Sequence, residues 1–227
     1  SESATAPFVN SVLGARTNRE GATAVASALT GLTPRCGMHI DENRRATVLL
    51  RVTAAIAGAD RYSLLGALAG RLAGDRVPVL EGLRTMPSTD DYVAFGAAFA
   101  IHGGAAMYHI AGITPEAPDV DAVFDGDPAD AILVDDAALE AERGRTATAN
   151  SGPVDIVAIG CPHASFDQLR DAAALIGTAT ANPDVVFYVH TNRSTWDAAA
   201  AEGVIATLTA AGVRVTADNC AVVSYDR

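Results

Sequence analysis

The fold is decided by the stretch Asp155-Ile-Val-Ala-Ile-Gly-Cys161-Pro-His163-Ala-Ser165-Phe-Asp-Gln-Leu169. Residues 154–159 are apolar apart from one aspartate, which predicts a strand buried on both faces of a parallel sheet. Gly160 permits a tight turn, and Ser165 followed by Gln168 matches the capping box that begins a helix. We therefore expect Cys161 at the carboxyl end of a strand, where ligands of open α/β sheets bind and a helix amino terminus favours a thiolate.

The same strand–helix unit recurs immediately. Residues 185–189 form an apolar strand pattern, residues 194–211 a helix pattern and residues 213–216 a third strand pattern, which leads into Asp-Asn-Cys220. Two cysteines at strand ends, in a chain with three, suggest a shared metal or cluster site. The alternative is that each cysteine is a small buried hydrophobic residue.

Composition bounds the remaining possibilities. The chain has 227 residues, 49% of them hydrophobic, enough for one large or two small domains with a real core. A net charge of -11 argues against nucleic-acid and anionic membrane partners, because both require clustered positive charge. We find no apolar run long enough to span a bilayer and no signal peptide, and we expect a cytoplasmic protein because the cysteines are few and odd in number.

All sixteen basic residues are arginine. Without lysine, this sequence supplies neither the Schiff-base lysine of pyridoxal phosphate enzymes nor the lysine of a phosphate-binding P-loop. Arginine remains available, and its planar guanidinium binds carboxylates and phosphates through two parallel hydrogen bonds.

Two polar segments near the amino terminus contain groups that could contact a ligand. The first, Asn10-Ser-Val-Leu-Gly-Ala-Arg-Thr-Asn-Arg-Glu-Gly21, precedes a predicted helix at 22–28 and suits a carboxylate ligand. A hydrogen-bonded turn is the alternative. The second segment is Cys36-Gly-Met-His-Ile-Asp-Glu-Asn-Arg-Arg45. There His39 could donate a proton, contact a ligand or be a buried structural histidine, Cys36 is interpreted as structural, and Arg44 and Arg45 as solvated charges.

Strands and helices alternate along the rest of the chain. We interpret His102 and His109, which flank the strand predicted at 105–110, as structural. The segment 116–152 is rich in Pro, Asp, Ala and Gly and is interpreted as an acidic connector. The expected organisation is an α/β lobe at 1–115, this connector, and a second α/β lobe at 153–227. The expected elements are strands at 47–53, 77–80, 105–110 and 132–134, and helices at 61–73, 90–101 and 137–142.

Taken together, these motifs resemble the aconitase X family over nearly the whole chain. The resemblance is carried by the twelve-residue motif at 10–21, by Leu-Thr-Gly-Leu-Thr-Pro34, Gly37-Met-His39, Glu42-Asn-Arg-Arg45 and Gly74-Asp-Arg-Val-Pro78, and by Gly160-Cys-Pro-His163. It implies aconitase-like βα units, with parallel or mixed sheets flanked by helices, in two lobes.

The resemblance also implies an iron–sulfur-dependent hydro-lyase. Known activities are dehydration of cis-3-hydroxy-L-proline, which we expect here, and of mevalonate 5-phosphate, which is the alternative. By motif, Cys161 and Cys220 correspond to cluster ligands. His39 and His163 are candidates for catalysis, and the general base is otherwise unassigned. The residues expected in the substrate pocket are Asn10, Ser11, Arg16, Thr17 and Asn18.

The chain departs from the family pattern at its ends. Family members carry an earlier segment with a cysteine loop and a smaller swivelling domain, fused or separate, that brings a serine to the active site. We therefore expect a chain truncated at both ends that binds no cluster by itself. A non-catalytic anion-binding or regulatory module on the same fold is the competing interpretation.

Overall fold

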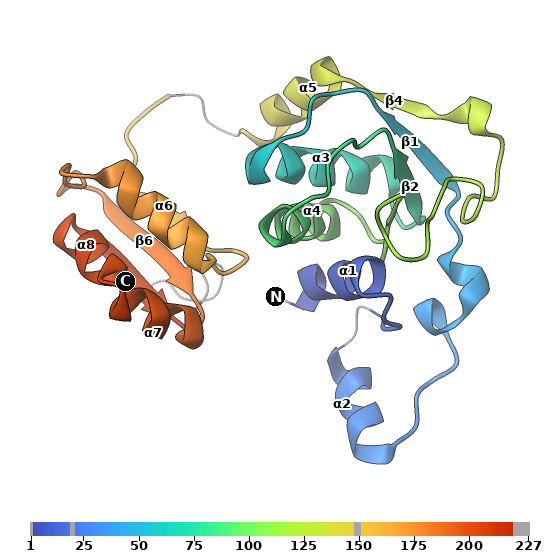
Figure 1. Cartoon of the computed structure of the whole chain (residues 1–227), viewed down its shortest axis with the longest axis horizontal. Helices are drawn as coiled ribbons and strands as arrows, with labels where there is room; N and C mark the ends of the chain where they lie inside the picture. The colour runs from blue at the N-terminus through green and yellow to red at the C-terminus, as the bar shows by residue number, and fades with distance from the viewer. Residues whose placement is uncertain (1, 19–20, 148–150, 220–227) are drawn as a thin grey trace. The chain divides into compact units, whose positions relative to one another are not determined.

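The computed structural model describes residues 2–18, 21–147 and 151–219. The chain divides into two units, residues 1–148 and 149–227. Each unit contains a sheet of parallel strands with helices packed on it, so the predicted α/β class with two lobes is confirmed (Figure 1). No helix within the described ranges combines the length and the apolar character needed to cross a membrane.

The sheet of the first unit has the strand order β3-β2-β1-β4. Its strands are β1 (Val48–Val52), β2 (Pro78–Glu81), β3 (His109–Ile110) and β4 (Ile132–Val134). All neighbouring pairs are parallel. The helices α3 (Gly58–Ala73), α4 (Thr89–His102) and α5 (Asp136–Thr146) supply the residues that form the largest core with one face of this sheet.

The second face of this sheet is covered by irregular chain. Leu49 and Val79 pack there against Met107, Val123 and the partly buried Met38. These contacts come from the chain on both sides of β3 and from the 3-10 turn η1 (Gly37–His39), with η2 (Asp41–Arg44) next in the chain and η3 (Pro128–Asp130) further on. A loop is thereby held against the sheet beside the strand that carries His109.

Helices α3 and α4 approach each other until their backbones touch. A Cβ atom at Gly66 would lie 2.3 Å from the carbonyl oxygen of Phe95, and one at Gly70 would lie 2.5 Å from that of Phe99. No side chain fits at either position. The start of α4 is fixed by a capping box, in which the side chains of Ser88 and Asp91 bond to each other's backbone N–H groups.

The segment expected to be a connector is different in the structure. Strand β4 pairs with β1 in parallel, and α5 packs on α3 with Leu139 fully buried. Glu142, 1% exposed, pairs with Arg71 across these two helices at 2.5 Å. Residues 116–148 therefore belong to the first unit, because a three-residue strand completes its sheet despite the polar composition around it.

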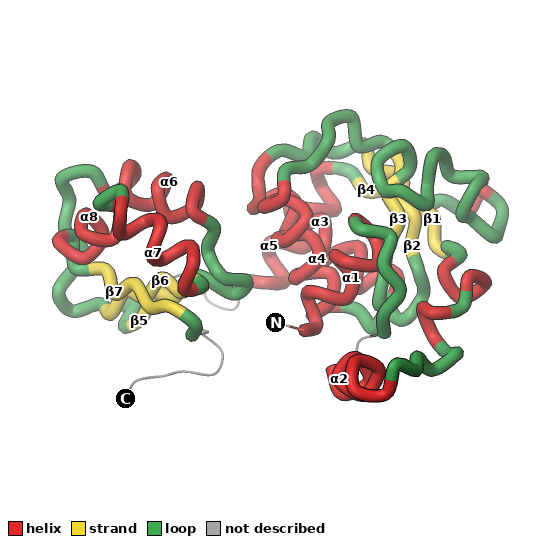
Figure 2. Tube along the Cα trace, turned by 60° about the horizontal axis from the view of Figure 1, so that its bottom comes forward, coloured by secondary structure: helices red, strands yellow, loops and turns green. Residues whose placement is uncertain are grey.

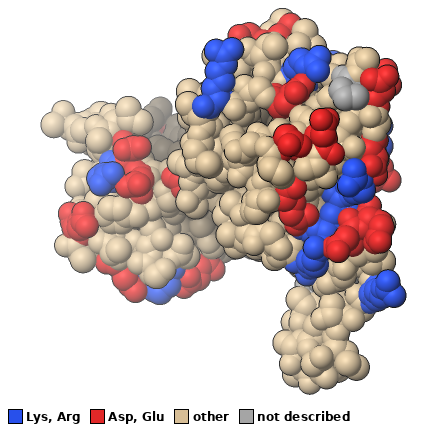
Figure 3. All heavy atoms as spheres, turned by 45° about the vertical axis from the view of Figure 1, so that its right-hand side comes forward, with Lys and Arg blue, Asp and Glu red and all other residues tan. Residues whose placement is uncertain are grey.

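Two helices precede the sheet. Helix α1 (Glu2–Val12) packs against α4, whereas α2 (Gly21–Thr30) has no charged residue and is mostly exposed, with Leu29 82% accessible. Figure 3 shows α2 as an uncharged projection, with arginine and acidic side chains gathered beside it.

The second unit has three parallel strands in the order β5-β6-β7. They are β5 (Ile156–Ile159), β6 (Val186–Thr191) and β7 (Val213–Ala217). The helices α6 (Phe166–Ile176), α7 (Arg193–Ala201) and α8 (Val204–Ala210) lie together on one face (Figure 2). Phe187, Val189, Val213 and Val215 face this helix layer.

Two expectations for the second unit are wrong. Strand β5 is at the edge of the described sheet, and Ile156 and Ile159, on opposite faces of the strand, are 52% and 46% exposed, because β5 has a neighbouring strand on one side only. An apolar run therefore did not mean burial on both faces. The single helix expected at 194–211 is two helices, since Gly203 adopts φ +76° between them.

We expect Gly160→Ala to destabilise the second unit strongly. A Cβ at this position would lie 2.2 Å from the carbonyl oxygen of His190, and φ is already +113°. Gly203→Ala is the matched control, because φ is +76° but nothing lies within 4 Å. The control should lose about 1 kcal/mol and Gly160→Ala about 3 kcal/mol or more in urea unfolding. Equal losses would show that the turn before Cys161 is not tightly packed.

Candidate functional site

The predicted substrate loop is held by Asn10, the tenth residue of the chain and part of α1. Asn10 is fully buried, and its amide nitrogen donates to the carbonyl oxygens of Thr17 at 2.7 Å and Ala106 at 2.9 Å. Its amide oxygen accepts from the backbone N–H of Thr17 at 2.9 Å. The amide thus closes the loop 10–17 and ties it to the chain entering β3.

Ser11 and Asn18 make two further contacts of this loop. The Ser11 hydroxyl oxygen, buried, accepts from the backbone N–H of Tyr108 at 2.9 Å. The Asn18 side-chain oxygen accepts from the backbone N–H of Met38 at 2.8 Å. The two polar segments identified in the sequence are therefore in direct contact, which their separation along the chain did not indicate.

The buried side chain of Arg44 connects these two segments. Its side chain is 2% exposed, so the interpretation of Arg44 as a solvated charge is wrong. The guanidinium donates to the carbonyl oxygens of Asn10 and Met38, each at 3.1 Å, and to both carboxylate oxygens of Glu116. The Nε–Oε2 distance to Glu116 is 2.9 Å, and Nη2 also contacts Oε1. A single buried cation thus connects α1, η1 and the loop after β3.

Glu116 balances the buried charge of Arg44. Burial alone would raise the pKa of the Glu116 carboxyl, but the hydrogen bonds and the positive charge of Arg44 outweigh burial and lower it below 4.5. Glu116 therefore stays ionised at neutral pH.

His109 packs against the same cluster and is 1% exposed. Its Nε2 lies 2.7 Å from the carbonyl oxygen of Arg44, which can only accept, so Nε2 carries a proton. Burial lowers the pKa of His109 below 6.5, although the bond to this carbonyl and the charge of Glu116 oppose the shift. The ring is therefore neutral near pH 7, with a lone pair at Nδ1. Within the described residues, Nδ1 is buried and has no hydrogen-bond partner.

A pocket of about 270 Å³ adjoins this cluster. Arg16 lines it, half-exposed, and its guanidinium contacts the exposed carboxylate of Asp41 at 2.6 Å. One pocket is thus lined by the predicted residue Arg16 and by the pair Arg44 and Glu116, which the sequence did not indicate. His39 does not line it, and any catalytic role of His39 stays a prediction. The lining comprises Arg16, Asp41, Arg44, Arg45, His109, Glu116, Ala122 and Val123.

The candidate site of the second unit is the carboxyl edge of its sheet. Cys161 follows β5 after one glycine and is exposed. In the same turn, the Nε2 of His163 lies 2.7 Å from the carbonyl oxygen of Asn219, which follows β7. The turn after β5 therefore reaches the end of β7, as expected if both strand ends share one site. Cys220 lies outside the described residues.

The strand ends between these turns are fixed by polar contacts. Asp218, with φ +58°, accepts from the backbone N–H of Arg193 at 2.8 Å at the start of α7, and its own N–H donates to the Thr191 carbonyl at 2.9 Å. His190 stacks on Tyr188, and its Nδ1 is 2.7 Å from the Thr216 hydroxyl. Burial, followed by the charge of His163, lowers the pKa of His190.

The described residues do not by themselves fit an iron–sulfur cluster. Such clusters take thiolate ligands, typically four, and the described part of this edge holds the thiol of Cys161. Across residues 2–18, 21–147 and 151–219, no group of three His, Cys, Asp or Glu side chains is arranged to bind a metal. The pairing of Cys161 with Cys220 stays a prediction.

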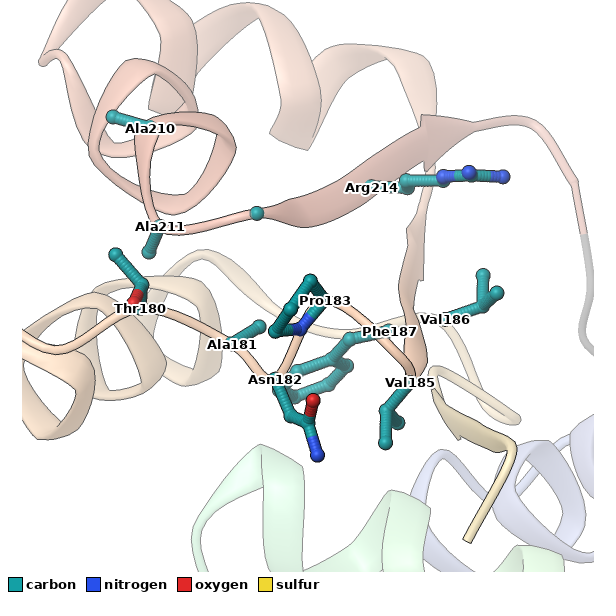
Figure 4. A pocket seen from close by; sticks show the side chains of 11 residues that line it. Thr180, Ala181, Asn182, Pro183, Val185, Val186, Phe187, Ala210, Ala211 and Arg214 are labelled. Carbon is teal, nitrogen blue, oxygen red and sulfur yellow. The ribbon is translucent and has the colours of Figure 1, made fainter.

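Another pocket of the second unit, about 430 Å³, lies at the opposite, amino-terminal edge of β6 and β7 (Figure 4). Asn182 and Pro183 line it from the loop before β6, and Ala211 lines it after α8. None of the residues predicted to bind substrate or metal is part of this lining.

Comparison with known proteins divides the chain into three consecutive family domains. Family models of the aconitase X first, second and third domains match residues 1–42, 46–144 and 154–226. This chain belongs to the aconitase X family. The family boundaries separate the residues before β1 from the sheet, although both pack within the first unit of the structure.

Named relatives of this aconitase X chain include two kinds of dehydratase. A phosphomevalonate dehydratase large subunit of Methanothermobacter thermautotrophicus is 39% identical over 99% of the chain and 54% of the relative. A cis-3-hydroxy-L-proline dehydratase of Pseudomonas aeruginosa is 37% identical over 94% of the chain and 37% of the relative. The crystal structure of holo-form aconitase X of Thermococcus kodakaraensis has a TM-score of 0.82 at 33% identity, covering 96% of this chain and 55% of that one. The chain thus spans about half the length of several curated relatives that it matches.

We expect Glu116→Gln to destabilise the first unit by about 3 kcal/mol, because it leaves the buried Arg44 cation uncompensated. Glu81→Gln is the control, since Glu81 pairs with Arg51 at an exposed position and should cost less than about 1 kcal/mol. Urea unfolding of both variants measures the difference. Similar small losses would mean that Arg44 and Glu116 do not hold the loop.

The pH dependence of unfolding provides a test of the buried histidine. Because the pKa of His109 is lower in the folded state, the unfolded state binds more protons below about pH 6.5. The stability that neutral His109 provides should be complete above pH 6.5 and decrease as the pH falls below it, with His190 acting in the same direction. Urea unfolding from about pH 7.5 to 5.5 should show a smaller decrease for His109→Gln than for the wild type. The exposed His102→Gln should retain the wild-type decrease, and a wild-type profile in His109→Gln would contradict this account.

Proposed function

We propose that this chain is part of a hydro-lyase that dehydrates a small hydroxy acid, with cis-3-hydroxy-L-proline as the expected substrate. The observation that carries the proposal is the contact between the loop 10–18 and the buried pair Arg44 and Glu116 beside one pocket. Family membership supports the reaction class, since relatives in both groups are named dehydratases.

The reaction removes a hydroxyl group and the proton on the neighbouring carbon. A base takes the proton from the carbon next to the carboxylate, and the electron pair of that C–H bond forms the new double bond. The C–O bond breaks, and the hydroxyl accepts a proton and leaves as water. An iron–sulfur cluster bound in the complete protein would supply a Lewis acid for the leaving hydroxyl. Arg16 would bind the carboxylate through two of its N–H groups. Asn10, Ser11, Thr17 and Asn18 would hold the loop that carries Arg16.

A phosphomevalonate substrate is the second candidate. Relatives named phosphomevalonate dehydratase large subunit are 39% and 36% identical to this chain, and three arginines line the pocket of the first unit. Those names also support a small-subunit partner, and we propose that it brings the serine expected from the family. Assay of the protein at the full length of its relatives with both acids decides between the substrates.

Arg16→Lys tests the proposed carboxylate contact. Lysine keeps the charge but cannot make two parallel hydrogen bonds, so kcat/KM of the full-length protein should fall about ten-fold or more. Arg170→Lys, at an exposed position of α6, is the control and should change kcat/KM little. Unchanged kinetics for Arg16→Lys would remove this residue from the substrate site.

Iron analysis tests the cofactor proposal. The chain holds three cysteines, and Cys36 lies in the first unit, so we expect the 227-residue chain to purify without iron and without dehydratase activity. The full-length protein, purified without oxygen, should contain iron and sulfide and form the unsaturated acid. Iron and turnover in the short chain, or neither in the full-length protein, would contradict the proposal.

A further inference from the structure

The pocket beside Arg16 is lined by His109, whose buried Nδ1 has no hydrogen-bond partner among the described residues. His109 is 1% exposed. A buried polar nitrogen without a partner destabilises the folded protein. A group that occupies the pocket and donates a hydrogen bond would remove this destabilisation.

The protonation state of His109 is fixed by its other nitrogen. The carbonyl oxygen of Arg44, 2.7 Å from Nε2, takes the ring's proton, so Nδ1 presents a lone pair. The same Arg44 is held on Glu116, Asn10 and Met38, which leaves the carbonyl little freedom to move. The ring is thus oriented as an acceptor before any ligand binds.

The other end of the pocket is suited to an anion. Three arginines and two acidic residues line it, in a protein whose net charge is -11. Arg44 is compensated by Glu116 inside the protein, whereas Arg16 is compensated by Asp41, whose side chain is 77% exposed. The carboxylate of Asp41 occupies the place on Arg16 that a ligand carboxylate would take, and an exposed pair of this kind is weak.

We propose that this pocket binds a small carboxylate that carries an adjacent hydroxyl or ammonium group. The carboxylate replaces Asp41 on Arg16, and the adjacent group donates a hydrogen bond to Nδ1 of His109. Because Nδ1 is covered in the structure, the ligand reaches it only when side chains that line the pocket move. This inference extends the proposed function by assigning His109 a contact with the substrate, where the sequence indicated a structural histidine.

The experiment measures binding to the 227-residue chain by calorimetry, with two probes of similar shape. Cis-3-hydroxy-L-proline has the carboxylate and both donors, and cyclopentanecarboxylate has the carboxylate alone. The wild type should bind the first about ten-fold more tightly than the second. His109→Gln keeps an amide N–H for the Arg44 carbonyl but carries its acceptor oxygen one bond farther from Cβ than Nδ1, so the acceptor leaves the position of Nδ1 and the variant should bind both probes equally. Asp41→Asn should bind both several-fold more tightly, because it frees Arg16.

Nitrogen NMR of the histidine rings provides a readout that a purely structural role would not change. The Nδ1 signal assigned to His109, identified by its loss in His109→Gln, should move with cis-3-hydroxy-L-proline and not with cyclopentanecarboxylate. Equal preference for the two probes in wild type and His109→Gln, or an unmoved Nδ1 signal, would overturn the assignment. So would a folded His109→Gln, with an unchanged melting temperature, that still discriminates between the probes.

The same data separate this inference from the proposed function. If the chain binds as described and the full-length protein fails to dehydrate either acid, the dehydratase proposal fails and the binding site stands. If turnover is present while His109→Gln retains the wild-type KM and kcat, the function stands and the role of His109 is wrong.

Discussion

The first unit depends on one buried ion pair, Arg44 with Glu116. A guanidinium taken out of water is stable only when its donors are matched, and here they are matched by a carboxylate and by two backbone carbonyl oxygens. The partners come from three separate segments of the chain. Neutralising either charge leaves the other one buried, so the loop 10–18, the turn η1 and the loop after β3 keep their relative positions together.

The second unit fixes the ends of its strands, within residues 151–219, without a buried ion pair. Parallel strands bring their carboxyl ends to one edge, and backbone contacts then fix the turns there: the Ala164 N–H donates to the His190 carbonyl at 2.9 Å, and the Thr191 hydroxyl donates to the Ala164 carbonyl at 2.7 Å. Gly160 is required because the chain passes directly over this carbonyl. The position of Cys161 follows from strand order and from one glycine.

Local signals in the sequence predicted most of the elements. The capping box at Ser165 and the strand at 132–134 were found where expected, because caps and short apolar runs act through neighbouring residues. Contacts between distant segments could not be predicted in this way. Burial of Arg44 depends on Glu116, 72 residues away, and the environment of His109 depends on both.

Exposure was the other property that the sequence did not decide. The strand at 156–159 is as apolar as a central strand, yet its position at the edge follows from which strands pair beside it. The rule that ligands of parallel sheets bind beyond the carboxyl ends of strands did not single out His109, because this residue begins β3. The histidines were judged one at a time, whereas their function depends on neighbours that only the fold brings together.

The edge position of β5 affects how this chain behaves at high concentration. Among the described residues β5 pairs with β6 alone, so its other side presents backbone donors and acceptors next to the exposed side chains of Ile156 and Ile159. Such an edge is a template for strand addition, by another polypeptide segment or by a second molecule. Proteins usually protect edges of this kind with charged residues or proline, and β5 has neither. Strand addition at β5 would therefore favour aggregation of the isolated chain, and a lysine in place of Ile156 would oppose it.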